Sequence, residues 1–179
     1  MTLIDSGAHA DSVYDYVLPR QHTRRRIFAC KGVDYLSKPG LVSEGTTKRT
    51  NIRLWTVATY AAKDRVLARM KIPKPGPGYM HLPDWATEEY LEQLTGEKKI
   101  TVRDRRTRTR KPLYVKTYTR NEALDLTVYC HAGLFILQYF IEPSTYRDLG
   151  RLAALVQQGH APGSLVPLRM RRVRSPGLA

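Results

Sequence analysis

Near its amino terminus the chain reads Thr2-Leu-Ile-Asp-Ser-Gly-Ala-His-Ala-Asp-Ser-Val-Tyr-Asp-Tyr-Val-Leu18. The apolar run at 2–4, followed by Asp5-Ser-Gly7, predicts a short strand that runs into a turn. Residues 10–18 carry apolar side chains on one helical face, which predicts an amphipathic helix that stops at Pro19. A strand followed at once by a helix is typical of an α/β fold.

The same alternation continues along the chain. We predict a polar loop over 37–50, and helices over 60–70, 88–95, 121–139 and 146–158. We predict strands over 26–31 (with Gly32 opening a loop), 52–57 and 79–82, and a hairpin-like pair, 99–102 and 113–118, around an arginine-rich loop. Apolar residues nearly encircle the helix at 121–139, so we expect it to be substantially buried. These elements predict a mixed sheet flanked by helices.

Length and composition indicate one domain rather than two. The chain has 179 residues, 42% of them hydrophobic, which is enough to bury a core. No window approaches the ~18 uninterrupted apolar residues of a membrane helix, and no secretory signal is recognisable. The cysteines, Cys30 and Cys130, are too few for a disulfide framework. We therefore expect a cytoplasmic protein with no membrane contact.

The excess of positive charge points to a polyanionic partner. The formal net charge is +14, and cations cluster at 24–26, at 103–120 and at 169–174. Such surfaces bind nucleic acid by releasing condensed counterions. Nucleic acid is the partner that we expect for the central cluster, whose candidate contacts are Arg103, Arg105, Arg106, Arg108, Arg110, Lys111 and Arg120. The last cluster lies in a Pro/Gly-bearing segment that we expect to be a flexible tail.

Few residues offer reaction chemistry. Asp5 ends a predicted strand, where a carboxylate can meet a ligand, although an Asx turn is its simpler interpretation. Asp125 stands between Leu124 and Leu126 one turn into a helix, where an unpaired carboxylate is costly. Glu122, at that helix's first turn, is explained by the helix dipole. Lys31 ends another strand and alone is a surface lysine.

Other chemistries fail because their residues are missing. The sequence has no phosphate-binding GxxxxGK[ST] loop, and no GxGxxG, HExxH, CxxC pair or GxSxG motif. Its five histidines do not fall at zinc spacing, and His131 fits a core position better than a ligand. A basic surface with carboxylates on a strand end and a helix favours phosphodiester hydrolysis assisted by two Mg²⁺ or Mn²⁺ ions.

Several motifs, in order and spacing, resemble the nuclease domain of lambda-type bacteriophage terminase large subunits. They are Ile4-Asp-Ser-Gly7, Val13-Tyr14, Ala29-Cys-Lys-Gly32, His81-Leu-Pro83, Leu94-Thr95, Glu97-Lys-Lys-Ile100, Arg120-Asn-Glu-Ala-Leu-Asp125 and Val128-Tyr129. The resemblance covers roughly residues 2–140. It implies an RNase H-like fold and an endonuclease that cuts concatemeric viral DNA during genome packaging.

The resemblance also implies roles for individual residues. Asp5 and Asp125 match metal-binding acids of the family, and Lys31 matches a lysine placed near its nuclease site. The family supplies a further acid from an upstream strand that has no counterpart here, for which Asp11, Asp15 or Asp34 are substitutes that spacing does not separate. The family's ATPase motor is also unmatched, so no nucleotide cofactor is expected.

We therefore expect a partial terminase nuclease domain over 1–142, a helix over 143–160 and a basic tail over 161–179. Its expected partners are double-stranded DNA and, as the resemblance implies, the terminase small subunit and the portal or procapsid. The expected setting is a bacterial host cell, with the gene on a phage or prophage. The alternative is a catalytically inactive DNA-binding or assembly remnant of the same domain. A small RNA-binding protein would explain the charge, but not Asp5, Lys31 and Asp125 together.

Overall fold

A computed structural model describes residues 1–23, 26–48, 50–104, 106 and 108–141. The chain divides into two compact units, Met1–Gly133 and Leu134–Ala179. The predicted helix at 146–158, the tail, Arg105 and most of the cluster at 24–26 lie outside the described residues. The domain boundaries proposed from the sequence therefore stay predictions.

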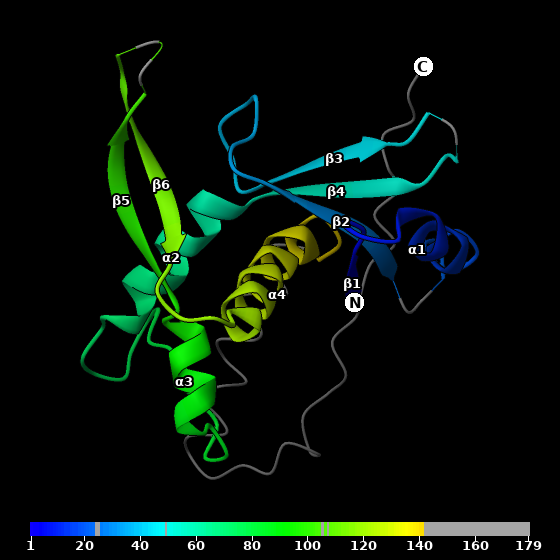
Figure 1. Cartoon of the computed structure of the whole chain (residues 1–179). Helices are drawn as coiled ribbons and strands as arrows, with labels where there is room; N and C mark the ends of the chain where they lie inside the picture. The colour runs from blue at the N-terminus through cyan, green and yellow to red at the C-terminus, as the bar shows by residue number, and fades with distance from the viewer. Residues whose placement is uncertain (24–25, 49, 105, 107, 142–179) are drawn as a thin grey trace, which may run out of the picture. The chain divides into compact units, whose positions relative to one another are not determined.

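The first unit is built on a four-stranded mixed sheet with strand order β1-β2-β4-β3 (Figure 1). Strands β1 (Thr2–Asp5), β2 (Ile27–Val33) and β4 (Arg53–Ala58) are parallel, and β3 (Val42–Thr46) runs antiparallel to β4. Helices flank this sheet, so the predicted mixed α/β class is confirmed. Its assignment as RNase H-like stays a prediction.

Three details of the strand prediction are wrong. The expected loop at 37–50 contains β3, a largely exposed edge strand. Its sequence, Val-Ser-Glu-Gly-Thr, is too polar to show the pattern of a strand. Pairing with β4 holds this strand in place, aided by an ion pair between Glu44 and Arg53. Strand β2 continues through Gly32 to Val33 instead of ending at Lys31, because β4 pairs with it there. Residues 79–82 form no strand.

The sheet buries apolar side chains on both faces. On one face, helix α1 (Ala10–Val17) closes a cluster of Val17, Ile27, Ala29 and Ile52. The alternate residues of β2 and β4 point the other way, where the rings of Phe28 and Trp55 meet edge to face at 6.4 Å. Alternation of this kind explains why central strands covered on both sides are apolar throughout.

Helices α2 (Thr59–Met70) and α4 (Glu122–Gln138) lie on that second face (Figure 1). In the first unit, α4 buries Leu124, Val128 and Ala132, which follow one another at intervals of four residues. Helix α4 is therefore substantially buried, as the sequence predicted, although Leu126 on its outer side is 66% exposed. Among the described residues, no helix is long and apolar enough to cross a membrane.

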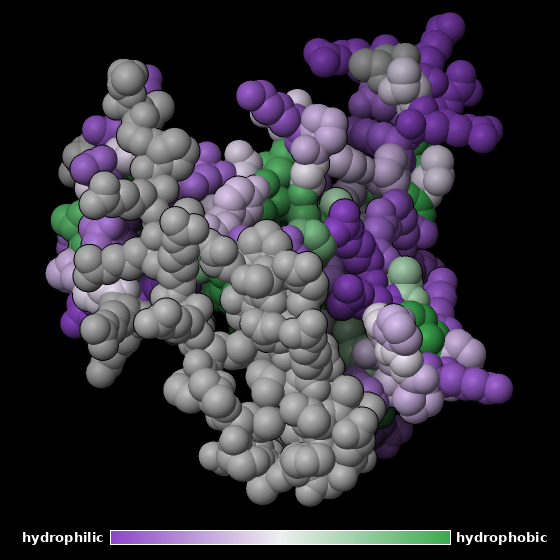
Figure 2. Space-filling view, turned by 180° about the vertical axis from the view of Figure 1, so that it is seen from behind, coloured by the Kyte–Doolittle hydropathy of each residue, from purple (hydrophilic) through white to green (hydrophobic). Residues whose placement is uncertain are grey.

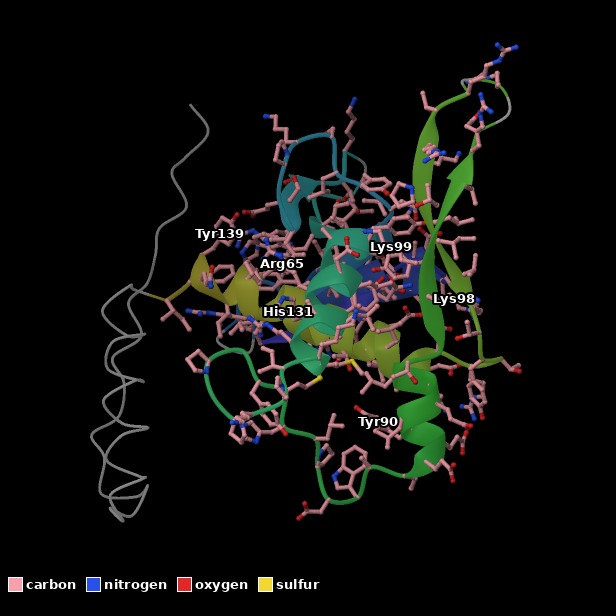
Figure 3. The ribbon with its side chains drawn as sticks, turned by 90° about the vertical axis from the view of Figure 1, so that its left-hand side faces the viewer. Arg65, Tyr90, Lys98, Lys99, His131 and Tyr139 are labelled. Carbon is pink, nitrogen blue, oxygen red and sulfur yellow. The ribbon has the colours of Figure 1, made fainter. Side chains whose placement is uncertain are left out.

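A separate two-stranded hairpin joins β5 (Glu97–Arg103) to β6 (Arg110–Lys116), which confirms the predicted pair and extends it. Both strands begin earlier than predicted, and β6 ends at Lys116 instead of Tyr118. The hairpin follows helix α3 (Glu88–Leu94), whose first turn is capped by the Thr87 hydroxyl accepting from the Tyr90 amide. Asp64 of α2 anchors the hairpin, because it accepts hydrogen bonds from Lys99 Nζ at 2.6 and 2.8 Å and from the Tyr114 hydroxyl at 2.6 Å. Figure 3 shows Lys99 on β5 beside α2.

The two tryptophans provide a matched test of this core. Trp55 is fully buried, whereas Trp85 is 69% exposed. We expect Trp55→Ala to lower the free energy of unfolding by about 3–5 kcal/mol because it leaves a large cavity. Trp85→Ala is expected to change it by less than about 1 kcal/mol. Urea denaturation of both variants measures the difference, and equal losses would contradict the assignment of the core.

Candidate functional site

A pocket of about 290 Å³ opens at the carboxyl ends of the parallel strands. Because β1, β2 and β4 are parallel, the residues that follow them meet at one edge of the sheet, where α/β proteins bind ligands. Helix α4 supplies the remaining wall. The lining residues are Asp5, Gly7, Lys31, Gly32, Val33, Asp34, Thr59, Asp125, Val128 and Tyr129.

Asp5 is the last residue of β1 and is held by the turn that follows. Its Oδ1 accepts a hydrogen bond from the Gly7 amide at 3.0 Å, which is the Asx turn that the sequence suggested. Ser6, next along the chain, is buried, and both its amide and its hydroxyl donate to the Cys30 carbonyl at 2.8 and 2.9 Å. Asp5 therefore forms the Asx turn and also lines the pocket, and the turn fixes the position of its carboxylate there.

Asp125 reaches the same pocket from α4 and belongs to a buried polar network. Lys63 Nζ lies 2.7 Å from Glu97 Oε2 and 3.6 Å from Asp125 Oδ1. The Asn121 amide donates to Glu97 Oε1 at 2.6 Å and to Asp125 Oδ2 at 3.0 Å. Burial raises the pKa of Asp125; the charge of Lys63 opposes this shift and that of Glu97 adds to it.

Gly32 is required where β2 passes the start of α2 and the ring of Tyr129. A Cβ atom at Gly32 would lie 2.8 Å from Thr59 Cγ2 and 3.0 Å from Tyr129 Oη. The Thr59 hydroxyl in turn donates to the Val33 carbonyl at 3.0 Å. Burial raises the pKa of Tyr129, and the charge of Asp5 and a hydrogen bond to it add to this effect. Tyr129 therefore bridges α4 and the end of β1.

The structure brings together the three residues that the sequence singled out. Asp5, Lys31 and Asp125 all line the pocket, although Asp5 and Asp125 are 120 positions apart in the sequence. Of the three substitute acids, Asp34 lines it, whereas Asp11 and Asp15 lie on α1 and do not.

Glu122 and His131, which the sequence analysis interpreted as structural, lie outside the pocket lining. Glu122 is exposed and pairs with Arg120 at 3.4 Å, away from the pocket lining. His131 is buried, and burial followed by the charges of Arg69 and Arg65 lowers its pKa, as expected for a neutral core residue. Figure 3 shows His131 near Arg65.

Sequence reasoning missed Lys63, Glu97, Asn121 and Tyr129. Glu97, Asn121 and Tyr129 were noticed only as parts of motifs, and a tyrosine on an apolar helix is normally interpreted as packing. Lys63 and Glu97 are 34 positions apart, and only the fold brings them together. The available signal was weak: a lysine among the buried positions of α2 is rare in proteins unless it is paired.

The basic cluster occupies the far end of the β5–β6 hairpin. Arg103, Arg106, Arg108, Arg110 and Lys111 are all exposed. Asp104 organises the turn, since it accepts from the Arg106 amide at 2.9 Å and from Lys111 Nζ at 3.2 Å. Figure 2 shows the hairpin end as a strongly hydrophilic projection.

Arg120 was predicted with this cluster but lies beyond the end of β6. Its guanidinium pairs with Glu89 at 3.1 Å and with Glu122 at 3.4 Å. The structure therefore separates Arg120 from the rest of the cluster, and a DNA contact by it stays a prediction.

The pocket's oxygen donors suit a hard divalent cation. Its ionisable lining residues are three aspartates, one lysine and one tyrosine, with no cysteine or histidine. Within the described part of the chain, no group of three or more acidic, histidine or cysteine side chains is close enough to enclose an ion. Mg²⁺, however, commonly keeps several waters and binds one or two carboxylates together with substrate phosphates. Asp5 and Asp125 fit that mode.

The structure thus combines carboxylates at the strand ends of an α/β sheet with an exposed cationic hairpin. The sequence model of one family, described as terminase large subunit gpA, endonuclease domain, matches residues 1–143. The chain belongs to this family, which confirms the resemblance noted above and implies DNA as the substrate. Searches of curated proteins and of solved structures found no significant match.

The close approach at Gly32 gives a first prediction for the site. Gly32→Ala is expected to lower the free energy of unfolding by about 1–3 kcal/mol, because the new methyl group overlaps Thr59 and Tyr129. Gly45→Ala serves as the control, since a Cβ atom there meets nothing within 4 Å. Chemical denaturation measures both, and a Gly32→Ala variant as stable as the control would contradict the packing described.

The raised pKa of Asp125 gives a second prediction, on the pH dependence of stability. When the pKa of a carboxyl is higher in the folded protein than in the unfolded chain, the protein becomes less stable as the pH rises from the usual pKa to the raised one. For Asp125 the usual value is 3.8. We expect Asp125→Asn to be more stable than the unsubstituted protein at pH 7, and the difference to vanish below about pH 3.8. Thermal unfolding at several pH values tests this, and a variant less stable at pH 7 would refute it.

Proposed function

We propose that this protein is a metal-dependent endonuclease domain that cuts concatemeric DNA during phage genome packaging. The observation that carries the proposal is the convergence of Asp5, Lys31 and Asp125 on one pocket. Family membership supports an endonuclease acting on DNA. Our proposal adds three points to family membership: the metal requirement, the cutting of concatemers and the roles of the individual residues.

Asp5 and Asp125 are the proposed ligands of Mg²⁺ or Mn²⁺. Two such ions supply Lewis-acid stabilisation of the attacking and leaving oxygens in phosphodiester hydrolysis. The Asx turn fixes one carboxylate and the Asn121 amide orients the other, so neither has to reorganise when a cation binds. Asp34, which follows β2 directly, is the third acid of the pocket and the substitute ligand that we favour.

Lys31 is proposed to contact the phosphate that is cut. It is exposed at the pocket, and its ammonium group can neutralise a phosphate oxygen that the carboxylates would otherwise repel. The hairpin cations are proposed to bind the DNA backbone without reading its sequence, because arginine and lysine contacts to phosphates carry no base information. A net charge of +14 supports such binding.

A second candidate function is DNA binding without cutting. It is favoured by the absence, among the described residues, of a group of three acids close enough to enclose an ion. Both candidates share the fold and the basic hairpin, so binding alone does not separate them. In either case the proposed setting is the cytoplasm of an infected bacterium, with the terminase small subunit and the portal or procapsid as further partners.

Plasmid cleavage in Mn²⁺ separates the two candidates. We expect cutting that EDTA abolishes and that Asp5→Asn or Asp125→Asn reduces by at least about a hundredfold, because each removes a cation ligand. DNA affinity is expected to stay equal or increase, since negative charge near phosphates is lost. Asp11→Asn, which neutralises an exposed aspartate outside the pocket lining, is the matched control.

Two results would count against the cutting function. Cleavage that survives both pocket substitutions would remove these residues from the mechanism. Salt-sensitive DNA binding with no cleavage by the unsubstituted protein would support the non-cutting candidate instead.

Charge reversal tests the hairpin. The double substitution Arg106→Glu/Arg108→Glu is expected to weaken binding to all duplex sequences alike and to flatten the dependence of affinity on salt, since fewer phosphates are neutralised. Lys71→Glu/Lys74→Glu makes the same change of charge at exposed sites outside the hairpin. Fluorescence anisotropy at several salt concentrations measures both. Equal losses would mean that net charge, and not the hairpin, drives binding.

A further inference from the structure

The ion pair between Lys63 and Glu97 is buried and links two elements of the fold. Lys63 and Glu97 are 9% and 8% exposed, and their side chains join α2 to the first residue of β5. Burying two charges requires desolvation that their attraction often only offsets, so such pairs are weak evidence for stability. The position of this pair, directly behind Asp125, suggests a role in the pocket.

Lys63 lies closer to Glu97 than to Asp125. Its ammonium group hydrogen-bonds to Glu97 at 2.7 Å, whereas its 3.6 Å approach to Asp125 is longer than a hydrogen bond. Asn121 donates to both carboxylates, which uses both hydrogens of its amide. Asp125 is left with a 48% exposed side chain at the pocket, while Glu97 takes up the lysine.

We propose that Glu97 is a positioning residue: it binds the Lys63 ammonium group and so keeps Asp125 available for a divalent cation in the pocket. Without the charge of Glu97, Lys63 would have Asp125 as its nearest anion and would compete with the incoming cation. This inference rests on the proposed metal-dependent function and adds the reason why a buried lysine is tolerated beside a metal ligand.

Three charges decide the electrostatics behind Asp125. Lys63, Glu97 and Asp125 together carry a net charge of −1, which attracts a cation. Neutralising Glu97 alone brings that sum to zero, and neutralising Lys63 and Glu97 together restores −1. Lys116, which lies opposite Glu97 in the hairpin register, contributes a weaker attraction to Asp125 and is unchanged in both cases.

The test measures Mn²⁺ binding by calorimetry in the full chain without DNA. Glu97→Gln is expected to weaken Mn²⁺ binding by about tenfold or more, because the attraction of one nearby unit charge is lost. The double variant Lys63→Met/Glu97→Gln is expected to recover affinity to within about threefold of the unsubstituted protein. A merely structural role predicts no such recovery, since the double variant lacks the whole ion pair.

Two control variants complete the experiment. Glu89→Gln neutralises an exposed glutamate that pairs with Arg120 and should leave Mn²⁺ affinity unchanged. Asp125→Asn should abolish the binding. Circular dichroism and thermal unfolding establish that each variant is folded, and the double variant serves where Glu97→Gln alone fails to fold.

The outcomes distinguish this inference from the function on which it rests. Mn²⁺ binding that Asp125→Asn leaves intact, or no binding by the unsubstituted protein, overturns the proposed metal site and the inference with it. Loss in Asp125→Asn with normal affinity in folded Glu97→Gln overturns the role of Glu97 alone. A double variant that binds no better than Glu97→Gln also overturns it.

Discussion

The parallel pairing of β1 with β2 is the constraint on which the site depends. The register sets Asp5 beside Cys30, so that Lys31 and the residues after it emerge at the edge where β1 ends. Pairing of β2 with β4 in the same direction brings the start of α2 to that edge as well. An antiparallel partner would have carried these residues to opposite ends of the sheet. One choice of strand direction thus places an acid, a lysine and a helix start around one pocket.

Close packing then determines how α4 completes the pocket. Gly32 lets the Tyr129 ring approach β2, and Leu124 and Val128 bury the same side of the helix beneath the sheet. Asp125 follows Leu124 by one residue, so a helix anchored by these apolar side chains must present its carboxylate at the rim of the buried face. Burial raises the pKa of Asp125, so ionising this carboxyl costs more free energy here than in water.

The sequence was informative where a single local pattern decides the outcome. Alternation at 52–57, the cap at Thr87 and the turn at Asp5-Ser-Gly7 each specify their own structure, and the corresponding elements were predicted. It failed at β3, where tertiary pairing holds a polar edge strand that no periodicity reveals. Taken singly, Asp5 and Lys31 have ordinary explanations, an Asx turn and a surface lysine, and they were proposed only in combination with Asp125 or through the family resemblance. Lys63 and Glu97 were not proposed at all. Their significance lies in a 2.7 Å contact between distant elements.

The same ion pair connects the two parts of the proposed function. Glu97 is the first residue of β5, and the strand that it begins ends at the basic turn of the hairpin. Asp64 fixes the hairpin to α2 one residue away from Lys63, so both anchors lie on the same turn of that helix. A hairpin attached in this way has a defined position relative to Asp125, because a displacement of its root would break contacts to α2 and to Asn121 together. In the proposed function, this attachment would let the basic end of the hairpin bind the DNA backbone without disturbing the geometry of the pocket.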